Sequence, residues 1–107
     1  MVPIEPDGSP GTVSEVTTIG GAPDGLTVDA CGHLYVVDQQ NSRLYRIRLT
    51  TGGNAVGTPT LLADFPTGVT NAQFGRGPGF SETATYASGN SGTVYRLEIG
   101  VPGAPYP

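Results

Sequence analysis

The sequence contains no lysine and no tryptophan, and only one cysteine and one histidine. Its five basic residues are all arginine and are outnumbered by nine acidic residues, which gives a formal net charge of −4 at pH 7. Nucleic-acid-binding surfaces need clustered basic side chains, so a nucleic-acid partner is not expected. The single cysteine cannot form a disulfide within the chain, and with one histidine it cannot complete a zinc site.

Long apolar runs and helical periodicity are also missing. No stretch approaches the roughly 20 apolar residues that span a bilayer, so no membrane partner is expected. No window repeats apolar residues with the period of an amphipathic helix, and the sequence therefore predicts essentially no helix.

Glycine and proline, by contrast, are abundant, with 17 and 10 copies among 107 residues. Between these turn-forming residues lie short runs that alternate apolar and polar residues and are rich in β-branched ones, a pattern typical of half-buried strands. The predicted strands cover residues 13–19, 26–30, 34–38, 43–49, 60–65, 69–74, 83–88 and 93–99. Residues 1–12 are predicted to form an irregular arm, and residues 101–107 an irregular tail because of their prolines. The sequence thus predicts one all-β domain.

The second half of the chain repeats the first. The segment LYRI at positions 44–47 recurs as VYRL at positions 94–97, Tyr35 corresponds to Tyr86, and residues 13–19 correspond to residues 60–65. A period of ~40–50 residues with about four strands per unit is typical of β-propeller blades. The repeat therefore predicts two four-stranded blades, over about 13–57 and 58–100, with their outer strands offset along the chain. In propellers the outermost strand of a blade often comes from the other end of the chain and closes the ring, and the offset fits such a closure.

Two blades cannot close a ring, because each would leave an apolar face in contact with water. Either the missing blades belong to a longer chain, or three copies assemble into a six-bladed ring. We expect the homotrimer if the 107 residues fold alone. A fragment that does not fold by itself is the third possibility.

Asp24 is the carboxylate whose setting most resembles a functional site. It lies in the P-D-G turn just before the predicted innermost strand, where its side chain could point into the mouth of a central channel. Asn71 occupies the corresponding strand start of the second unit and could supply a further oxygen ligand. Each residue also has a plainer interpretation, because Asp24 could cap its own turn and Asn71 could bind neighbouring backbone groups.

The remaining polar candidates favour structural roles. Asp29 is expected to accept backbone N–H groups in a tight turn, and Asp38 either bonds the following turn or lies near the channel. His33 and Cys31 belong to the same turn and have no predicted catalytic partner. The glycine-rich run at 75–79 is not followed by a predicted helix, so it lacks the context that binds phosphate. The recurring tyrosines are expected in the packing between blades.

The segment PDGLTVDACGHLYVVDQQNSRLYRI, at positions 23–47, resembles the senescence-marker-protein/gluconolactonase/luciferin-regenerating family of six-bladed propellers. The family's late-blade pattern has the same order: P-D-G, a small–apolar strand, D-x-x-G, and then strands similar to LYVVD and RLYRI. The second unit, from TNAQFGRGPGF to YRLEIGVPGAP, resembles the last blade and C-terminal tail of secreted-type members. The resemblance covers residues 13–104.

This resemblance implies a metal-dependent hydrolase. In the family one divalent cation, usually Ca²⁺, lies at one end of the channel and is held by a Glu, by Asn side chains and by the Asp of the P-D-G turn. That Asp is also the proposed base that activates water for lactone hydrolysis, and both roles carry over to Asp24. The Glu and Asn ligands come from earlier blades that these residues do not include, so Asn71 is assigned from its position alone. In a three-copy ring, three copies of Asp24 would repel one another unless a cation relieved them.

Two functions are therefore expected. The first is a Ca²⁺-dependent lactonase-type hydrolase that acts on a lactone or sugar-like ligand, and the resemblance to secreted-type members implies a secreted or periplasmic origin. The second is a non-catalytic propeller unit that serves as a binding or assembly scaffold. The missing ligands favour the scaffold for the isolated chain, whereas the resemblance favours the hydrolase for a longer protein that contains it.

Overall fold

The computed structural model describes residues 4, 6–9, 11–90 and 92–105. Within these residues the chain forms β-strands and no helix, as the sequence predicts. The strands are β1 (Pro23–Val28), β2 (Leu34–Asp38), β3 (Arg43–Ile47), β4 (Thr60–Asp64), β5 (Asn71–Phe74), β6 (Ala84–Ser88) and β7 (Val94–Glu98).

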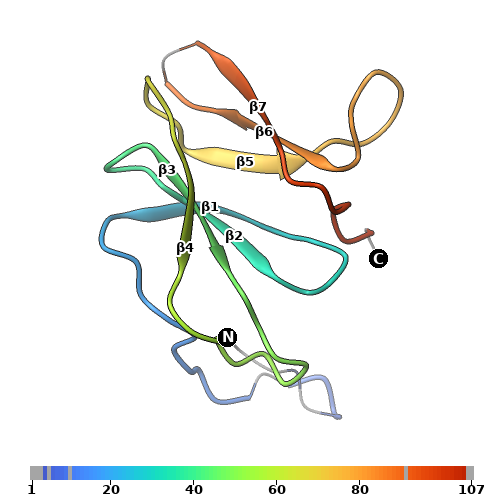
Figure 1. Ribbon diagram of the computed structural model, residues 1–107. Coiled ribbons are helices and arrows are strands. Elements are labelled where there is room, and N and C mark those ends of the chain that lie inside the picture. Colours follow the sequence, from blue (N-terminus) through green and yellow to red (C-terminus); the bar gives the residue numbers. More distant parts are fainter. Residues whose placement is uncertain (1–3, 5, 10, 91, 106–107) are drawn as a thin grey trace.

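The strands form two antiparallel sheets, each a simple meander. The first sheet has the order β1-β2-β3-β4 and the second the order β5-β6-β7. Figure 1 shows the second sheet, in yellow to red, above the first, in blue to green. The first strands of the two sheets, β1 and β5, contact each other. The observed structure is therefore all-β with one four-stranded and one three-stranded sheet.

The predicted strand over residues 13–19 is wrong, since the described part of the chain has no strand before β1. A strand is stable only where a neighbouring strand satisfies its backbone N–H and C=O groups. The outer edge of the first sheet is already occupied by β4. Residues Val16 to Ile19 instead line a shallow groove over the first sheet, together with Leu34, Val36 and Ile47. The second sheet has three strands and not the predicted four, because no segment of the described residues pairs with the outer edge of β7.

Strand boundaries also differ in detail. β1 begins at Pro23, three residues before the predicted start, with a register irregularity between Pro23 and Leu26. Proline is tolerated there because it is the first residue of a strand and needs to donate no ladder hydrogen bond. Within the predicted tail, residues 101–105 contain no strand and only the isolated bridge between Asp29 and Gly103. Residues 1–3, 5 and 10 of the predicted arm lie outside the described residues.

The hydrophobic core lies between the two sheets. Alternate residues of β2 and β3 point toward the second sheet, and alternate residues of β5 and β6 point back. The buried members are Tyr35, Val37, Leu44, Val69, Ala72, Phe74 and Ala87. Two aromatic pairs span the sheets, Tyr35 with Phe74 and Phe65 with Tyr95, each with ring centroids 5.3 Å apart. Burial of a side chain of this size contributes roughly 1.5–3 kcal/mol, so this layer holds the sheets together.

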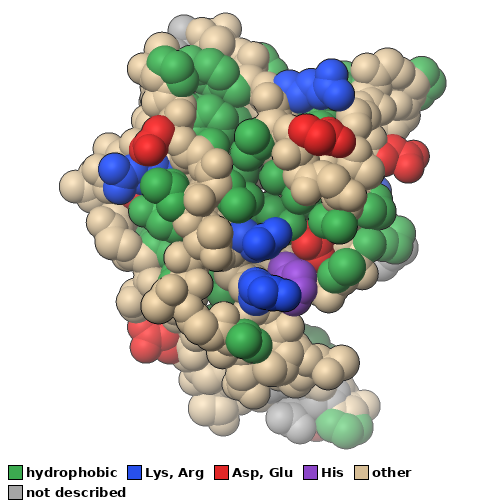
Figure 2. Space-filling model, viewed as in Figure 1, with side chains coloured by type: hydrophobic (Ala, Val, Ile, Leu, Met, Phe, Trp, Pro, Cys, Tyr) green, Lys and Arg blue, Asp and Glu red, His purple; other side chains and the backbone are tan. Residues whose placement is uncertain are grey.

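Each sheet has a second face that the other sheet does not cover. On the first sheet we call it the Val36 face, and its members, which are Cα partners across the strands, are Leu26, Val36, Tyr45 and Leu61. On the second sheet we call it the Tyr86 face, and its partners across the strands are Gln73, Tyr86 and Arg96, with Val94 beside them. Large apolar side chains are exposed on both faces, among them Leu26 at 52%, Leu61 at 44% and Val94 at 67%. Figure 2 shows exposed hydrophobic side chains between scattered charges of both signs.

The end of the chain ties the sheets together. The Pro102 carbonyl accepts a 2.8 Å hydrogen bond from the Ala30 N–H, and the Ala104 N–H donates to the Val28 carbonyl at 2.9 Å. The Gly103 N–H donates at 3.3 Å to the carbonyl of Glu82, which precedes β6. A Cβ at Gly103 would lie 2.5 Å from Cβ of Phe74, so only glycine allows this close approach.

Candidate functional site

The structure brings the two predicted site residues to the same place, where β1 and β5 begin. The Gly25 N–H donates a 2.9 Å hydrogen bond to the Thr70 carbonyl. A Cβ at Gly25 would lie 2.1 Å from Oδ1 of Asn71, so the backbone beside Asp24 packs directly against the Asn71 side chain. Any larger residue at position 25 would push the two strand starts apart.

Both side chains are exposed, and their settings differ. Asp24 is the second residue of β1 and is exposed to solvent. Asn71 is also exposed, and its Oδ1 accepts the Ala72 N–H at 2.9 Å and the Gln73 side-chain amide at 3.5 Å. The amide oxygen of Asn71 therefore already binds its own strand, as its plainer interpretation expects, and its role as a metal ligand stays a prediction.

The donors at this edge fit part of a calcium site. Ca²⁺ takes roughly six to eight oxygen ligands, and a carboxylate and an amide oxygen are both suitable. The described residues contain no group of three or more His, Cys, Asp or Glu side chains that could hold a metal ion. The other oxygen ligands would therefore have to be backbone carbonyls, amide side chains, waters or groups of further sheets.

Asp29 is a structural residue, as predicted. It is 2% exposed, and its Oδ1 accepts the backbone N–H groups of Cys31 at 2.8 Å and His33 at 3.0 Å. Its Oδ2 accepts the Tyr35 hydroxyl at 2.7 Å. Burial, together with this hydrogen bond to a carboxylate, raises the pKa of Tyr35 to about 12.

Asp38 closes the turn after β2. It is fully buried, and its Oδ1 accepts the backbone N–H groups of Ala22 at 3.0 Å, Gln40 at 3.0 Å and Asn41 at 3.3 Å. Its Oδ2 accepts the Asn41 side-chain amide at 2.8 Å. Burial by itself would raise the pKa of Asp38, but these hydrogen bonds outweigh burial and lower the pKa below its usual value. Of the two interpretations of Asp38, the structure supports the bond to the following turn.

No catalytic arrangement surrounds His33 or Cys31 among the residues that the structure describes. Nδ1 of His33 accepts the Leu49 N–H at 3.0 Å, so the imidazole ties the start of β2 to the segment after β3. That bond uses the nitrogen that a general base or a metal would need, and leaves Nε2 as the donor. Cys31 is an exposed free thiol in the adjacent turn.

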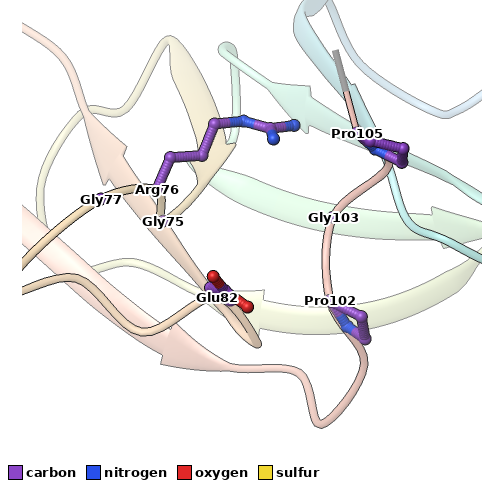
Figure 3. A pocket seen from close by; sticks show the side chains of 7 residues that line it. All are labelled: Gly75, Arg76, Gly77, Glu82, Pro102, Gly103 and Pro105. Carbon is purple, nitrogen blue, oxygen red and sulfur yellow. The ribbon is translucent and has the colours of Figure 1, made fainter.

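The sequence did not predict the hollow beside the glycine-rich loop. It measures about 280 Å³ and is lined by Gly75, Arg76, Gly77, Glu82, Pro102, Gly103 and Pro105. Figure 3 shows Arg76 and Glu82 on opposite sides of it, with the end of the chain along a third side. The Arg76 guanidinium donates to the Ala104 carbonyl. A Cβ at Gly75 would lie 2.2 Å from the Ser81 carbonyl oxygen, so that glycine serves close packing, and no helix follows the loop in the described residues.

The chain matches no protein-family model, no curated protein and no solved structure. The part of the chain that the structure describes has no helix that could serve as a transmembrane span. The resemblance to gluconolactonase-like propellers therefore rests on the motifs of the sequence.

Proposed function

We propose that this chain supplies two blades of a gluconolactonase-like β-propeller that hydrolyses lactones with the help of a divalent cation. The observation that supports this most is the meeting of β1 and β5, where the backbone next to Asp24 packs on the Asn71 side chain. In a propeller the first strand of each blade lines the central channel, and two stacked meanders with adjacent first strands fit that arrangement.

The chemistry assigned to the chain's own residues is simple. A bound Ca²⁺ would polarise the lactone carbonyl as a Lewis acid. Asp24 would accept a proton from water while the water oxygen attacks the carbonyl carbon, and it would return that proton to the ring oxygen as the ring C–O bond breaks, which gives the hydroxy acid and restores the carboxylate. Because Asp24 is exposed at the strand start, it is accessible to both a cation and a substrate. Asn71 would contribute an oxygen ligand to the cation or orient the other ligands of the cation.

The test is acid release from a small lactone, measured with and without EDTA. We expect release that EDTA abolishes and that Ca²⁺ restores, and we expect Asp24→Asn to lose both the activity and the Ca²⁺ affinity measured by calorimetry. Asp64→Asn is a matched control, because it removes an exposed carboxylate on β4 that pairs with Arg43. Unchanged Ca²⁺ affinity in Asp24→Asn would contradict the proposal.

A non-catalytic assembly scaffold is the second candidate, and the exposed apolar residues on the two uncovered faces favour it. Apolar patches of this kind usually mark contact surfaces. For this function we expect light scattering to give three times the 10.9 kDa of one chain, the mass of a six-bladed ring. Trimer without EDTA-sensitive acid release would favour the scaffold over the hydrolase, and a monomer with cooperative unfolding would reject the scaffold.

A further inference from the structure

We propose that residues 13–19 of one copy of the chain form the missing fourth strand of the second sheet of another copy, alongside β7. The copies would then join head to tail. This inference rests on the uncovered faces that also favour the scaffold function, and it does not depend on lactone hydrolysis.

The first observation is the open edge of β7. Among the described residues β7 pairs with β6 alone, whereas β3, its counterpart in the repeat, has β4 on its other side. An open edge presents backbone N–H and C=O groups that can pair with another strand. Addition of a strand at such an edge is a common mode of protein association.

The second observation is the correspondence between residues 13–19 and β4. Thr27 and Gln73 are the partners of Tyr35 and Tyr86, which occupy the same place in the two repeats. Val16 precedes Thr27 by 11 residues, and Leu62 precedes Gln73 by the same number. Ile19 and Phe65 likewise each precede them by eight residues, so Val16 aligns with Leu62 and Ile19 with Phe65. Residues 13–19 thus have the spacing of an outer strand, with apolar residues at matching positions.

The third observation is where this segment lies. Leu62 packs against the core between the two sheets, and Phe65, the residue after β4, contacts Tyr95 of the second sheet. Residues Val16 to Ile19 lie over the Val36 face of the first sheet, beside Leu34, Val36 and Ile47. Val16 and Ile19 thus lie on the first sheet, and their counterparts Leu62 and Phe65 lie on the core that the second sheet faces. The segment occupies the place of the outer strand of a preceding sheet, although the described residues contain no such sheet.

The second sheet of another copy fits this place. Its Tyr86 face would cover the Val36 face, which brings Val94, 67% exposed, and Phe80, 54% exposed, onto Leu26 and Leu61. Phe80 belongs to the Tyr86 face because its ring packs edge to face on that of Tyr86, with the ring centroids 5.2 Å apart. Because the two faces in contact differ, the association is heterologous. Copies would add head to tail until the rotation between successive copies closes a ring.

The β3–β4 ladder predicts the register of the new pair. Leu44 opposes Ala63 and Tyr45 opposes Leu61 in the first sheet. In the repeat, Val94 and Tyr95 correspond to Leu44 and Tyr45. Thr17 and Glu15 correspond to Ala63 and Leu61 in the alignment of residues 13–19 with β4. The expected pairs between copies are therefore Val94 with Thr17 and Tyr95 with Glu15.

A cross-linking experiment tests this register. Two single-cysteine proteins, Thr17→Cys and Val94→Cys, are each made with Cys31→Ser and then mixed in equal amounts under mild oxidation. Because each protein carries one thiol, every disulfide joins two copies. We expect the mixed dimer to exceed either homodimer at least about tenfold, and a Thr58→Cys partner, in an exposed loop, to give no such preference. Equal yields of mixed and like dimers would overturn the proposal.

A second variant separates strand exchange from association in general. Val16→Pro removes a backbone donor from the segment but lies outside both sheets, so each chain should keep its fold. We expect its light-scattering mass to fall to that of one chain, with an unchanged far-ultraviolet circular dichroism spectrum, whereas Thr12→Pro should leave the mass unchanged. If Val16→Pro still assembles, strand exchange is wrong while the scaffold function stands. If the unmodified chain is itself monomeric, both are wrong, and the lactonase proposal is still decided by acid release.

Discussion

The hydroxyl of Tyr35 donates a 2.7 Å hydrogen bond to Oδ2 of Asp29, and both side chains are almost completely buried. Tyr35 also contacts Phe74 of the second sheet edge to face. The same carboxylate holds the β1–β2 turn through two backbone N–H groups. The β1–β2 turn and the packing between the two sheets therefore both depend on the buried hydrogen bond between Tyr35 and Asp29.

Tyr35→Phe should destabilise the fold although it keeps the aromatic ring. The substitution leaves the buried Oδ2 of Asp29 without its donor, which costs about 1–3 kcal/mol. Urea denaturation followed by circular dichroism measures the change in unfolding free energy. Tyr95→Phe is the matched control, and its cost should be smaller because the hydrogen bond between Tyr95 and Thr67 is exposed. Equal costs would contradict the importance of the buried pair.

Alkaline pH should weaken the same contact. The pKa of Tyr35 is raised to about 12 by burial and by the Asp29 carboxylate, whereas an ordinary tyrosine ionises near pH 10. Because the folded pKa is the higher one, the stabilisation is fully present below about pH 10 and is lost as the pH rises toward 12. Ultraviolet titration of tyrosinate should show one late-ionising tyrosine that Tyr35→Phe removes. A Tyr35→Phe titration identical to that of the unmodified chain would contradict this assignment.

Acidic pH should destabilise the fold by protonating Asp38. Its pKa is lowered in the folded chain, since its hydrogen bonds outweigh the effect of burial. The stabilisation is therefore present above the unfolded pKa of about 3.9 and is lost as the pH falls through the folded value. Asp38→Asn should lower the unfolding free energy by about 1–3 kcal/mol at neutral pH, and the difference from the unmodified chain should shrink in strong acid. A difference that stays constant from neutral pH to strong acid would show that the carboxylate charge is not responsible.

Gly25→Ala should separate the starts of β1 and β5. The added Cβ would lie 2.1 Å from Oδ1 of Asn71 and 2.5 Å from its Cα, and a backbone contact cannot move aside as a flexible side-chain end can. Forcing extra volume into such a contact typically costs about 1–3 kcal/mol. Gly20→Ala is the control, because nothing lies within 4 Å of its added Cβ. Thermal unfolding measures the cost, and we expect a lower midpoint for Gly25→Ala than for Gly20→Ala; equal midpoints would contradict the close contact between β1 and β5.

Local patterns in the sequence predicted most of the strands. Alternation and turn residues predicted all seven strands of the structure, and the role of Asp29 followed from the turn around it. These features depend on residues that are close in sequence, so each can be predicted from a single short segment of the chain. Residues 13–19 show the same pattern but form no strand, because pairing depends on a partner edge that a local pattern does not contain.

The sequence predicted Asp24 and Asn71 as oxygen ligands at the mouth of one channel, but not the contact between their strands. Each residue marks a predicted strand start, whereas the packing of Asn71 on the backbone of Gly25 depends on the contact between β1 and β5. The hollow of Arg76 and Glu82 was not foreseen, because the end of the chain returns from far along the sequence to form one wall.

The sequence by itself determined the alternation of strands and turns, the internal repeat of two units and the absence of helix from the described residues. Only the tertiary structure decided which edges are paired and which faces are covered, because a strand's backbone and a sheet's apolar face are satisfied by whichever partner the fold places beside them. Here β4 pairs with β3, while the outer edge of β7 has no partner among the described residues and the Val36 face is covered only in part, by residues 16–19.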